Sequence, residues 1–212
     1  MDIINSIIER VKEKFADSKG SHDWEHTQRV FNLALHIGAK EKADLIIIKY
    51  AAILHDIGRA HQDTTNGKVC HAQKGAALAR EMLHLYNLPP DQINAITHCI
   101  ETHRFRGGKK PESKEAKVLF DADKLDSIGA VGVGRAFLFA GEIGAKLHNK
   151  DIDIENSRAY SREDTAYREY SVKLKYVKKR MLTSEGKRIA EGRHSFMVSF
   201  FEQLNEEVSG NK

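Results

Sequence analysis

The stretch AAILHDIGRA, residues 51–60, brings two polar neighbours, His55 and Asp56, to the end of an almost continuous apolar run. The run begins near residue 42 and is apolar nearly all round, which predicts a central, buried helix. Gly58 indicates where this helix ends. An aspartate is unfavourable near the negative end of a helix dipole, so the pair predicts a positive charge close by. The alternative is that His55 and Asp56 only cap the helix.

Apolar residues recur at helical spacing along most of the chain. In the first predicted helix they lie three and four residues apart: Ile3, Ile4, Ile7, Ile8, Val11 and Phe15. Further helices are predicted over residues 22–38, 42–57, 71–86, 90–104, 114–128, 130–147, 163–181 and 184–208. No strand pair is predicted, so we expect an all-α fold. It would consist of a helical core over residues 1–147 and a helical extension over residues 148–212, packed together as one structural unit.

The composition indicates a single globular unit. The 212 residues are 41% hydrophobic and 30% charged, which suffices for one sizeable core and is short for two. Two cysteines, Cys70 and Cys99, form neither a disulfide framework nor a zinc pattern, which favours a reducing compartment. The sequence shows no basic leader before an apolar stretch and no uncharged apolar run of about 18 residues. We therefore expect a cytoplasmic protein without membrane contact.

One stretch carries an excess of positive charge equal to the net charge of +4. Residues 104–117 (RFRGGKKPESKEAK) hold six Lys or Arg against two Glu. A nucleic-acid-binding protein more often spreads its basic residues over a whole face, whereas one basic loop suits a small anion such as phosphate. The alternative is a solvated loop made mobile by its two glycines.

Helical spacing predicts which titratable residues face the interior. His26 and His103 each lie on the apolar stripe of a predicted helix, whereas His98 lies on a polar side. Further along the chain, Asp121 and Asp123 both fall next to apolar positions, and spacing does not choose between them. A single inward histidine is more often a hydrogen-bonded core residue than a ligand, so His26 alone does not indicate a site.

Several inward imidazoles and carboxylates taken together predict a metal ion. Burying two carboxylates among imidazoles makes sense mainly if a cation compensates them. His nitrogens and Asp oxygens without thiolates suit Mn, Fe, Co, Ni or Zn ions better than they suit a structural zinc site. Such an ion lowers the pKa of a bound water, and the resulting hydroxide attacks phosphorus or carbonyl centres near neutral pH.

These residues resemble the HD-domain superfamily of metal-dependent phosphohydrolases, whose signature is H…HD…D and in which HDIG is a frequent variant. The segments SHDWEHTQRV, ILHDIG, ETHRFRGG, DADKLDSIGAVGVGRAF and MLTSEGKRIAEGRHSFMVSFFEQL are similar to a subgroup of small stand-alone HD proteins that includes bacterial pyrophosphohydrolase-like members. The likeness covers nearly the whole chain. It implies a compact helical bundle of the HD-domain type with a carboxy-terminal helical extension.

The resemblance also implies a ligand set. It assigns four metal ligands: His26, His55, Asp56 and Asp123. Asp123 is preferred to Asp121 because the last ligand of the family commonly precedes a basic residue and Leu, as in Lys124-Leu125 here. Asp121 then becomes a candidate for orienting a ligand histidine. His22, four residues before His26, is a second such candidate or a substrate contact, unless it simply begins its helix.

His71 and His103 fall where some members of the superfamily place ligands for a second metal. The alternatives are phosphate contact for both residues and, for His71, a helix start with no partner. We expect one divalent ion by default, with Mn, Fe, Co, Ni, Mg and Zn as candidates, and two ions as the alternative.

The chain departs from relatives that carry acidic residues just after the His-Asp pair, which leaves the general acid unassigned. Candidates for charge neutralisation or proton delivery are Arg59, His61 and Lys124, although Arg59 could equally be a surface residue. Four basic residues next to His103 are candidates for phosphate binding: Arg104, Arg106, Lys109 and Lys110.

The sequence therefore predicts a metal-dependent phosphohydrolase acting on a phosphate ester or phosphoanhydride. The resemblance suggests nucleotides as substrates, including nucleoside triphosphates cleaved to a monophosphate and pyrophosphate. The alternatives are a non-catalytic sensor of a phosphorylated ligand and, less favoured, a helical nucleic-acid-binding module. The oligomeric state is left open, a homo-oligomer included.

Overall fold

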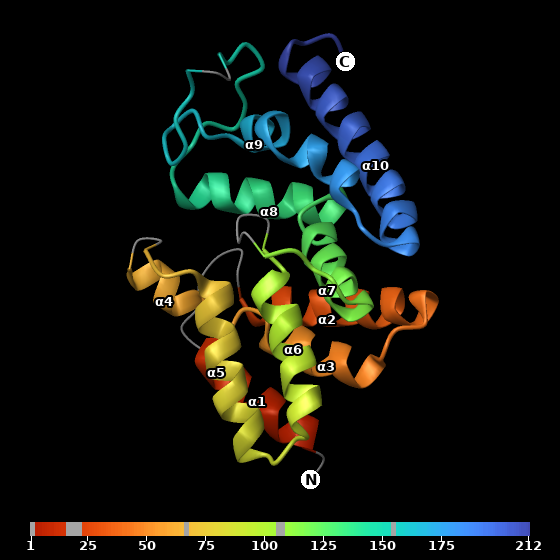
Figure 1. The fold of residues 1–212 in the computed structure, drawn as a ribbon. Coiled ribbons are helices and arrows are strands. Elements are labelled where there is room, and N and C mark those ends of the chain that lie inside the picture. Colours follow the sequence, from red (N-terminus) through yellow and green to blue (C-terminus); the bar gives the residue numbers. More distant parts are fainter. Residues whose placement is uncertain (1–2, 16–22, 66–67, 105–108, 154–155) are drawn as a thin grey trace. The chain divides into compact units, whose positions relative to one another are not determined.

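The structure is a computed structural model of the chain that describes residues 3–15, 23–65, 68–104, 109–153 and 156–212 (Figure 1). All regular secondary structure in these ranges is helical, which confirms the predicted all-α class. None of the described helices is long and apolar enough to cross a membrane.

The chain forms two compact units, Met1–Asp123 and Lys124–Lys212. The boundary between these units lies inside one helix. The sequence predicts a boundary between residues 147 and 148 instead, and this predicted division into a core and an extension stays a prediction. The described residues of the first unit form six complete helices and most of a seventh: α1 (Ile3–Phe15), α2 (Trp24–Glu41), α3 (Leu45–Leu54), α4 (Arg59–Thr64), α5 (His71–Leu85), α6 (Pro90–Thr102) and α7 (Lys114–Leu125).

Helix α3 is the centre of the first unit. It packs against α1, α2, α5 and α6. Its buried residues cover nearly every side of the helix: Ile47, Ile48, Ala51, Ala52, Ile53 and Leu54. The predicted central helix is therefore present, and its apolar character follows from contact with neighbours all round.

Side-chain caps fix where the helices beside the core begin. The Asp23 carboxylate accepts a hydrogen bond from the backbone N–H of His26 at 2.9 Å and so sets the phase of α2. Asp44 does the same for α3 by accepting from the N–H groups of Ile46 and Ile47. Each such cap contributes about 1 kcal/mol to helix stability.

The turn after α3 differs from the prediction. The helix ends at Leu54 and not at residue 57, and the short helix α4, which lacks an apolar repeat, was not predicted. Gly58 explains the turn, since a Cβ there would lie 2.3 Å from the carbonyl oxygen of His71 and 2.6 Å from the nitrogen of Gly75. Only glycine lets the backbone pass this close to the first turn of α5.

The second unit contains α8 (Gly129–Glu142), α9 (Ala166–Val172), the 3₁₀ helix η1 (Leu174–Arg180) and α10 (Ser184–Val208). Helix α8 packs against α9 and α10, and η1 packs against α9 and α10. The predicted single helix over residues 163–181 is wrong. Lys173 leaves helical geometry (φ −140°, ψ −56°), and the tighter η1 places Leu174 and Val177, three residues apart, on one buried face.

Two other predicted helices are shorter than expected at their carboxyl ends. Helix α7 stops at Leu125 instead of residue 128, and Gly129 beyond it takes a φ of +78°. Helix α8 stops at Glu142 instead of residue 147, because Gly144 takes a φ of +67° that ends the helix.

Candidate metal centre

Six His and Asp side chains from the first unit meet at the carboxyl end of α3. They come from α2, the turn after α3, α5, the end of α6, and α7: His26, His55, Asp56, His71, His103 and Asp123. The first five are buried, with at most 3% of each residue exposed, and the Asp123 side chain is 15% exposed. We call these six residues the His/Asp cluster.

The cluster contains two groups of donor atoms. In the first group, His26 Nε2 lies 3.4 Å from His55 Nε2 and 3.4 Å from Asp123 Oδ1. In the second group, His71 Nε2 lies 3.2 Å from His103 Nε2 and 3.5 Å from Asp56 Oδ1. The ligand atoms of each group all lie within 4.8 Å of one another.

Asp56 faces both groups. Its Oδ2 lies 3.8 Å from the Nε2 atoms of His26 and His55, while its Oδ1 lies 3.5 Å from His71 Nε2 and 3.8 Å from His103 Nε2. One buried carboxylate therefore stands between two pairs of imidazoles, with a different oxygen directed at each pair.

Hydrogen bonds fix the tautomer of three of these histidines. The Nδ1–H groups of His55 and His103 donate to the backbone carbonyls of Ala52 (2.8 Å) and Ile100 (2.6 Å). The Nδ1–H of His71 donates to Gln62 Oε1 at 2.8 Å, and the backbone N–H of His71 approaches the same oxygen. In a neutral imidazole the other nitrogen then carries a lone pair. Three Nε2 lone pairs consequently face the Asp56 carboxylate.

Burial keeps His55 and His71 neutral. It lowers the pKa of His55 to about 4, although the Asp56 charge opposes the shift. It lowers the pKa of His71 to about 2, again against the effect of Asp56 and with help from the positive charges of Arg59 and Arg104. Protonation of His55 and His71 therefore does not supply the positive charge that the Asp56 carboxylate needs.

A divalent cation fits these atoms. Ligands bound to one ion at about 2.1 Å lie roughly 3.0–3.4 Å apart at octahedral or tetrahedral angles. Four distances within the two groups, at 3.2–3.5 Å, are close to this range, and the distance from Asp56 Oδ1 to His103 Nε2 is 3.8 Å. Neutral imidazole and carboxylate donors without thiolates are those of a site for Mn, Fe, Co, Ni or Zn.

Two arginines lie beside the second group. Arg59 Nη2 is 3.2 Å and 3.3 Å from the two oxygens of Asp56 and 3.5 Å from His71 Nε2. Arg104 Nη1 donates to Cys70 Sγ at 3.4 Å, next to His71 in the chain. The positive charge predicted near the His-Asp pair is therefore present, and it comes from Arg59.

The other residues singled out in the sequence are more scattered. His61 is exposed on α4, and Asp121 is fully buried in α7 but belongs to neither group. Lys109 is exposed and pairs with Glu101 at 2.6 Å.

Four further positions were singled out in the sequence: Lys110, Lys124, His22 and Arg106. Lys110 is exposed, and Lys124 is half-buried at the start of the second unit. His22 and Arg106 lie outside the described residues.

Sequence reasoning missed the groups that orient the histidines. His55 and His103 both follow the last residue of a helix and reach the carbonyl three residues back, a pattern that a predicted helix end could have revealed. Gln62 gave no signal because it lies on the short helix α4, which has no apolar repeat to reveal it.

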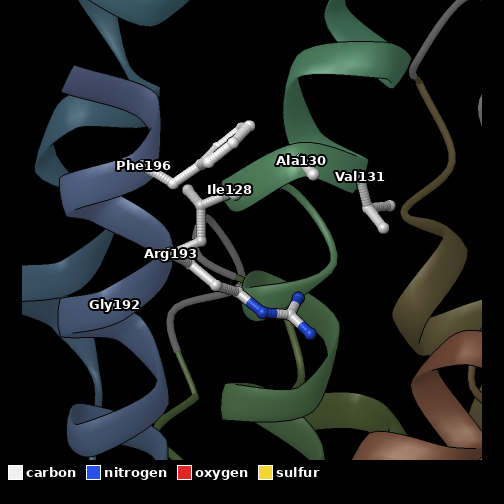
Figure 2. Close-up of a pocket in the computed structure, with 7 residues that line it drawn as sticks. Ile128, Ala130, Val131, Gly192, Arg193 and Phe196 are labelled. Atoms are coloured by element: carbon white, nitrogen blue, oxygen red, sulfur yellow. The ribbon is translucent and has the colours of Figure 1, made fainter. Parts of the chain in front are cut away.

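The second unit has its own pocket, of about 300 Å³ (Figure 2). It lies between the start of α8 and the middle of α10, and it is lined by Ile128, Gly129, Ala130, Val131, Gly192, Arg193 and Phe196. Arg193 Nη1 donates to the carbonyl of Leu125 at 2.6 Å, and burial lowers the pKa of its guanidinium. The pocket is otherwise apolar and holds none of the His/Asp cluster.

The helical fold and the buried His/Asp cluster together are those of a helical protein that binds a divalent metal ion. A family model described as HD domain matches residues 23–128, which include all six residues of the cluster. The chain belongs to the HD superfamily of metal-dependent phosphohydrolases, and the predicted hydrolase class is confirmed.

Individual relatives agree with this assignment. The protein YpgQ of Bacillus subtilis is 36% identical over 205 residues, which are 94% of this chain and 91% of YpgQ. The crystal structure of YpgQ in complex with ADP matches with a TM-score of 0.76 at 31% identity, covering 99% of this chain and 100% of that one. An HD-superfamily hydrolase from Bacillus thuringiensis matches with a TM-score of 0.76 at 27% identity, covering 97% and 96% of the two chains.

Proposed function

We propose that this chain hydrolyses a phosphoanhydride or phosphate ester of a nucleotide, with nucleoside triphosphates cleaved to monophosphate and pyrophosphate as the first reaction to test. The observation that carries the proposal is the convergence of neutral Nε2 atoms on the buried Asp56 carboxylate, which favours a cation as its partner. The presence of ADP in the structure of YpgQ supports a nucleotide as the ligand.

We assign the metal ligands as four residues of the cluster: His26, His55, Asp56 and Asp123. Manganese is the ion to test first, with Fe, Co, Ni, Mg and Zn as alternatives. His71 and His103, with the second oxygen of Asp56, form the proposed site for a second ion or for a phosphate group. When bound, a divalent ion supplies a Lewis acid for a phosphoryl oxygen and acidifies water.

The residues of the chain supply position and charge. Asp123, the most exposed member of the cluster, orients the attacking water. Arg59 and Arg104, which lie beside His71, bind phosphoryl oxygens and offset negative charge as it moves toward the leaving group. The carbonyls of Ala52 and Ile100 hold the imidazoles so that their Nε2 atoms stay directed at the site.

A cytoplasmic location is part of the proposal. Both cysteines are free thiols, and Cys99 is buried in the core. Burial raises the pKa of the Cys99 thiol to about 12, so it stays protonated and unreactive at neutral pH. Free thiols suit a reducing compartment.

The test measures phosphate and pyrophosphate release separately from a panel of nucleotides. Metal-stripped protein is supplied in turn with Mn, Co, Mg or Zn, beside Asp56→Ala and the matched control Asp91→Ala, which removes an exposed carboxylate from the first turn of α6. We expect metal-dependent release in the wild type and in the control only. Metal bound without any release would contradict the proposed reaction and favour a phospholigand sensor.

A further inference from the structure

Arg59 occupies part of the second group of donors. Its Nη2 atom lies 3.2 Å and 3.3 Å from the two oxygens of Asp56 and 3.5 Å from Nε2 of His71. The second group consists of Asp56, His71 and His103, so one guanidinium nitrogen contacts two of its three members. Arg59 is the first residue of α4, and 18% of its side chain is exposed.

The position of Arg59 and the binding of a second ion exclude each other. The one lone pair of His71 Nε2 is not available to a cation while it faces an N–H donor of Arg59, whereas each Asp56 oxygen keeps a second lone pair. Arginine keeps its charge at all ordinary pH values, so only movement of the side chain can release the lone pair of His71 Nε2. It also brings a full positive charge to the place where the ion would bind, which opposes binding by repulsion.

The present position of Arg59 leaves one of its own donors unused. Its Nε atom is buried and has no hydrogen-bond partner among the described residues. A buried donor without an acceptor costs free energy, so another position of the side chain that satisfies Nε is not strongly disfavoured. A phosphoryl group is one acceptor that matches a guanidinium through two parallel hydrogen bonds.

We propose that Arg59 is a built-in cation that controls how many metal ions the His/Asp cluster holds. While Arg59 contacts Asp56 and His71, the first group binds one ion tightly, and the guanidinium takes the place of an ion at the second group. When a phosphorylated ligand draws Arg59 away, the second group becomes free for a second ion. This inference rests on the metal site of the proposed function and assigns a specificity-determining residue to it.

The test counts metal ions and does not depend on turnover. Metal-stripped protein is titrated with Mn²⁺ in equilibrium dialysis, and its electron paramagnetic resonance spectrum is recorded. Arg59→Gln is compared with Arg80→Gln, a matched loss of one arginine whose guanidinium donates to Asn94 and Thr97 on α6. Arg59→Lys, which keeps the charge, and Arg59→Gln combined with His71→Ala complete the set.

We expect wild type and Arg80→Gln to bind one Mn²⁺ tightly and a second one much more weakly. Arg59→Gln should bind the second ion at least about tenfold more tightly, because one repelling charge is removed. Its spectrum should show the spin coupling of two ions roughly 3.5–4 Å apart. Arg59→Lys should fall between the two, and the double variant should lose the second ion.

The outcomes separate this inference from the proposed function. A second Mn²⁺ whose affinity is the same in wild type, Arg59→Gln and Arg59→Lys would overturn the role of Arg59 and leave the first metal site intact. Wild type that binds no Mn²⁺ or other divalent ion at the first group would overturn both. Arg59→Lys keeps the comparison decisive if Arg59→Gln does not fold.

Discussion

Buried aspartates occur in both compact units, and they differ in what neutralises them. In the second unit, Asp164 accepts a hydrogen bond from Arg168 at 2.7 Å and Asp126 accepts one from Arg135 at 2.8 Å. In the first unit, Asp56 lies 3.2 Å from its arginine and is approached by the Nε2 atoms of four imidazoles. A short arginine bond completes a structural ion pair, whereas imidazole lone pairs around a carboxylate leave room for a cation.

Replacing one aspartate of each kind by asparagine should separate an effect on activity from an effect on stability. The loss of activity in the first unit is the largest effect that we expect. Asp56→Asn should lower phosphate or pyrophosphate release about 1000-fold or more, because it removes the charge of a carboxylate that we propose as a metal ligand. Asp164→Asn removes the carboxylate charge that neutralises the buried Arg168, whose other hydrogen bonds go to Ser157, and should cost about 3–5 kcal/mol of unfolding free energy. Activity per folded molecule and urea unfolding measure the two effects. Equal loss of activity in both variants would remove the distinction.

The pH dependence of stability should also single out the first unit. Burial lowers the pKa of His55 to about 4 and the pKa of His71 to about 2. In the unfolded chain both histidines have the ordinary pKa of 6.5, so they bind protons as the pH falls below 6.5, whereas in the folded chain they stay neutral to lower pH. The metal-free protein should therefore lose a few kcal/mol of stability as the pH falls from about 7 to 4.

Urea unfolding of the metal-free protein at a series of pH values measures this loss. His55→Gln should flatten the profile, whereas His84→Gln, which changes an exposed histidine on α5, should leave it unchanged. A profile that is equally steep in His55→Gln would show that the loss arises elsewhere in the chain.

Metal should stabilise the protein through the His/Asp cluster. An ion at a hundredfold excess over its Kd adds about 2.7 kcal/mol to the free energy of unfolding. Thermal unfolding with Mn²⁺ or with a chelator measures this gain. It should be retained in Asp164→Asn and lost in Asp56→Asn. A gain that survives in Asp56→Asn would place the ion somewhere other than this cluster.

The smallest expected effect concerns the orientation of His71. Gln62→Leu removes the acceptor for the His71 Nδ1–H and frees the imidazole to rotate or change tautomer. Affinity for the second Mn²⁺, measured in the Arg59→Gln background, should fall about 10-fold to 100-fold. Affinity for the first ion should not change. An unchanged second affinity would mean that packing alone orients His71.

Much of the fold followed from apolar spacing. The helix around residues 45–54, which is apolar nearly all round, is the central helix of its unit, and the repeat in residues 184–208 gave α10 with the correct bounds. Helix ends were less predictable, since they depend on single residues in unusual backbone geometry. Gly144 and Lys173 ended or interrupted helices that the apolar pattern would have continued.

The site was predictable where its residues lie on long helices or in the His-Asp pair. His26, His55 and His103 carried a signal because each lies on or directly after an apolar stripe. Spacing could not choose between Asp121 and Asp123, and in the structure both are shielded from solvent while only Asp123 joins the first group. The place of Arg59 could not be predicted, because it depends on the close approach of Gly58 to the start of α5.

The most direct measurement of the central claim is the anomalous scattering of a Mn²⁺ ion in crystals of metal-stripped protein soaked with MnCl₂. We predict a peak bounded by the Nε2 atoms of His26 and His55 and by the carboxylates of Asp56 and Asp123, with no such peak in crystals of Asp56→Asn. A strong peak away from these four residues, or none at a concentration that supports phosphate or pyrophosphate release, would contradict the assignment of the His/Asp cluster as the metal centre.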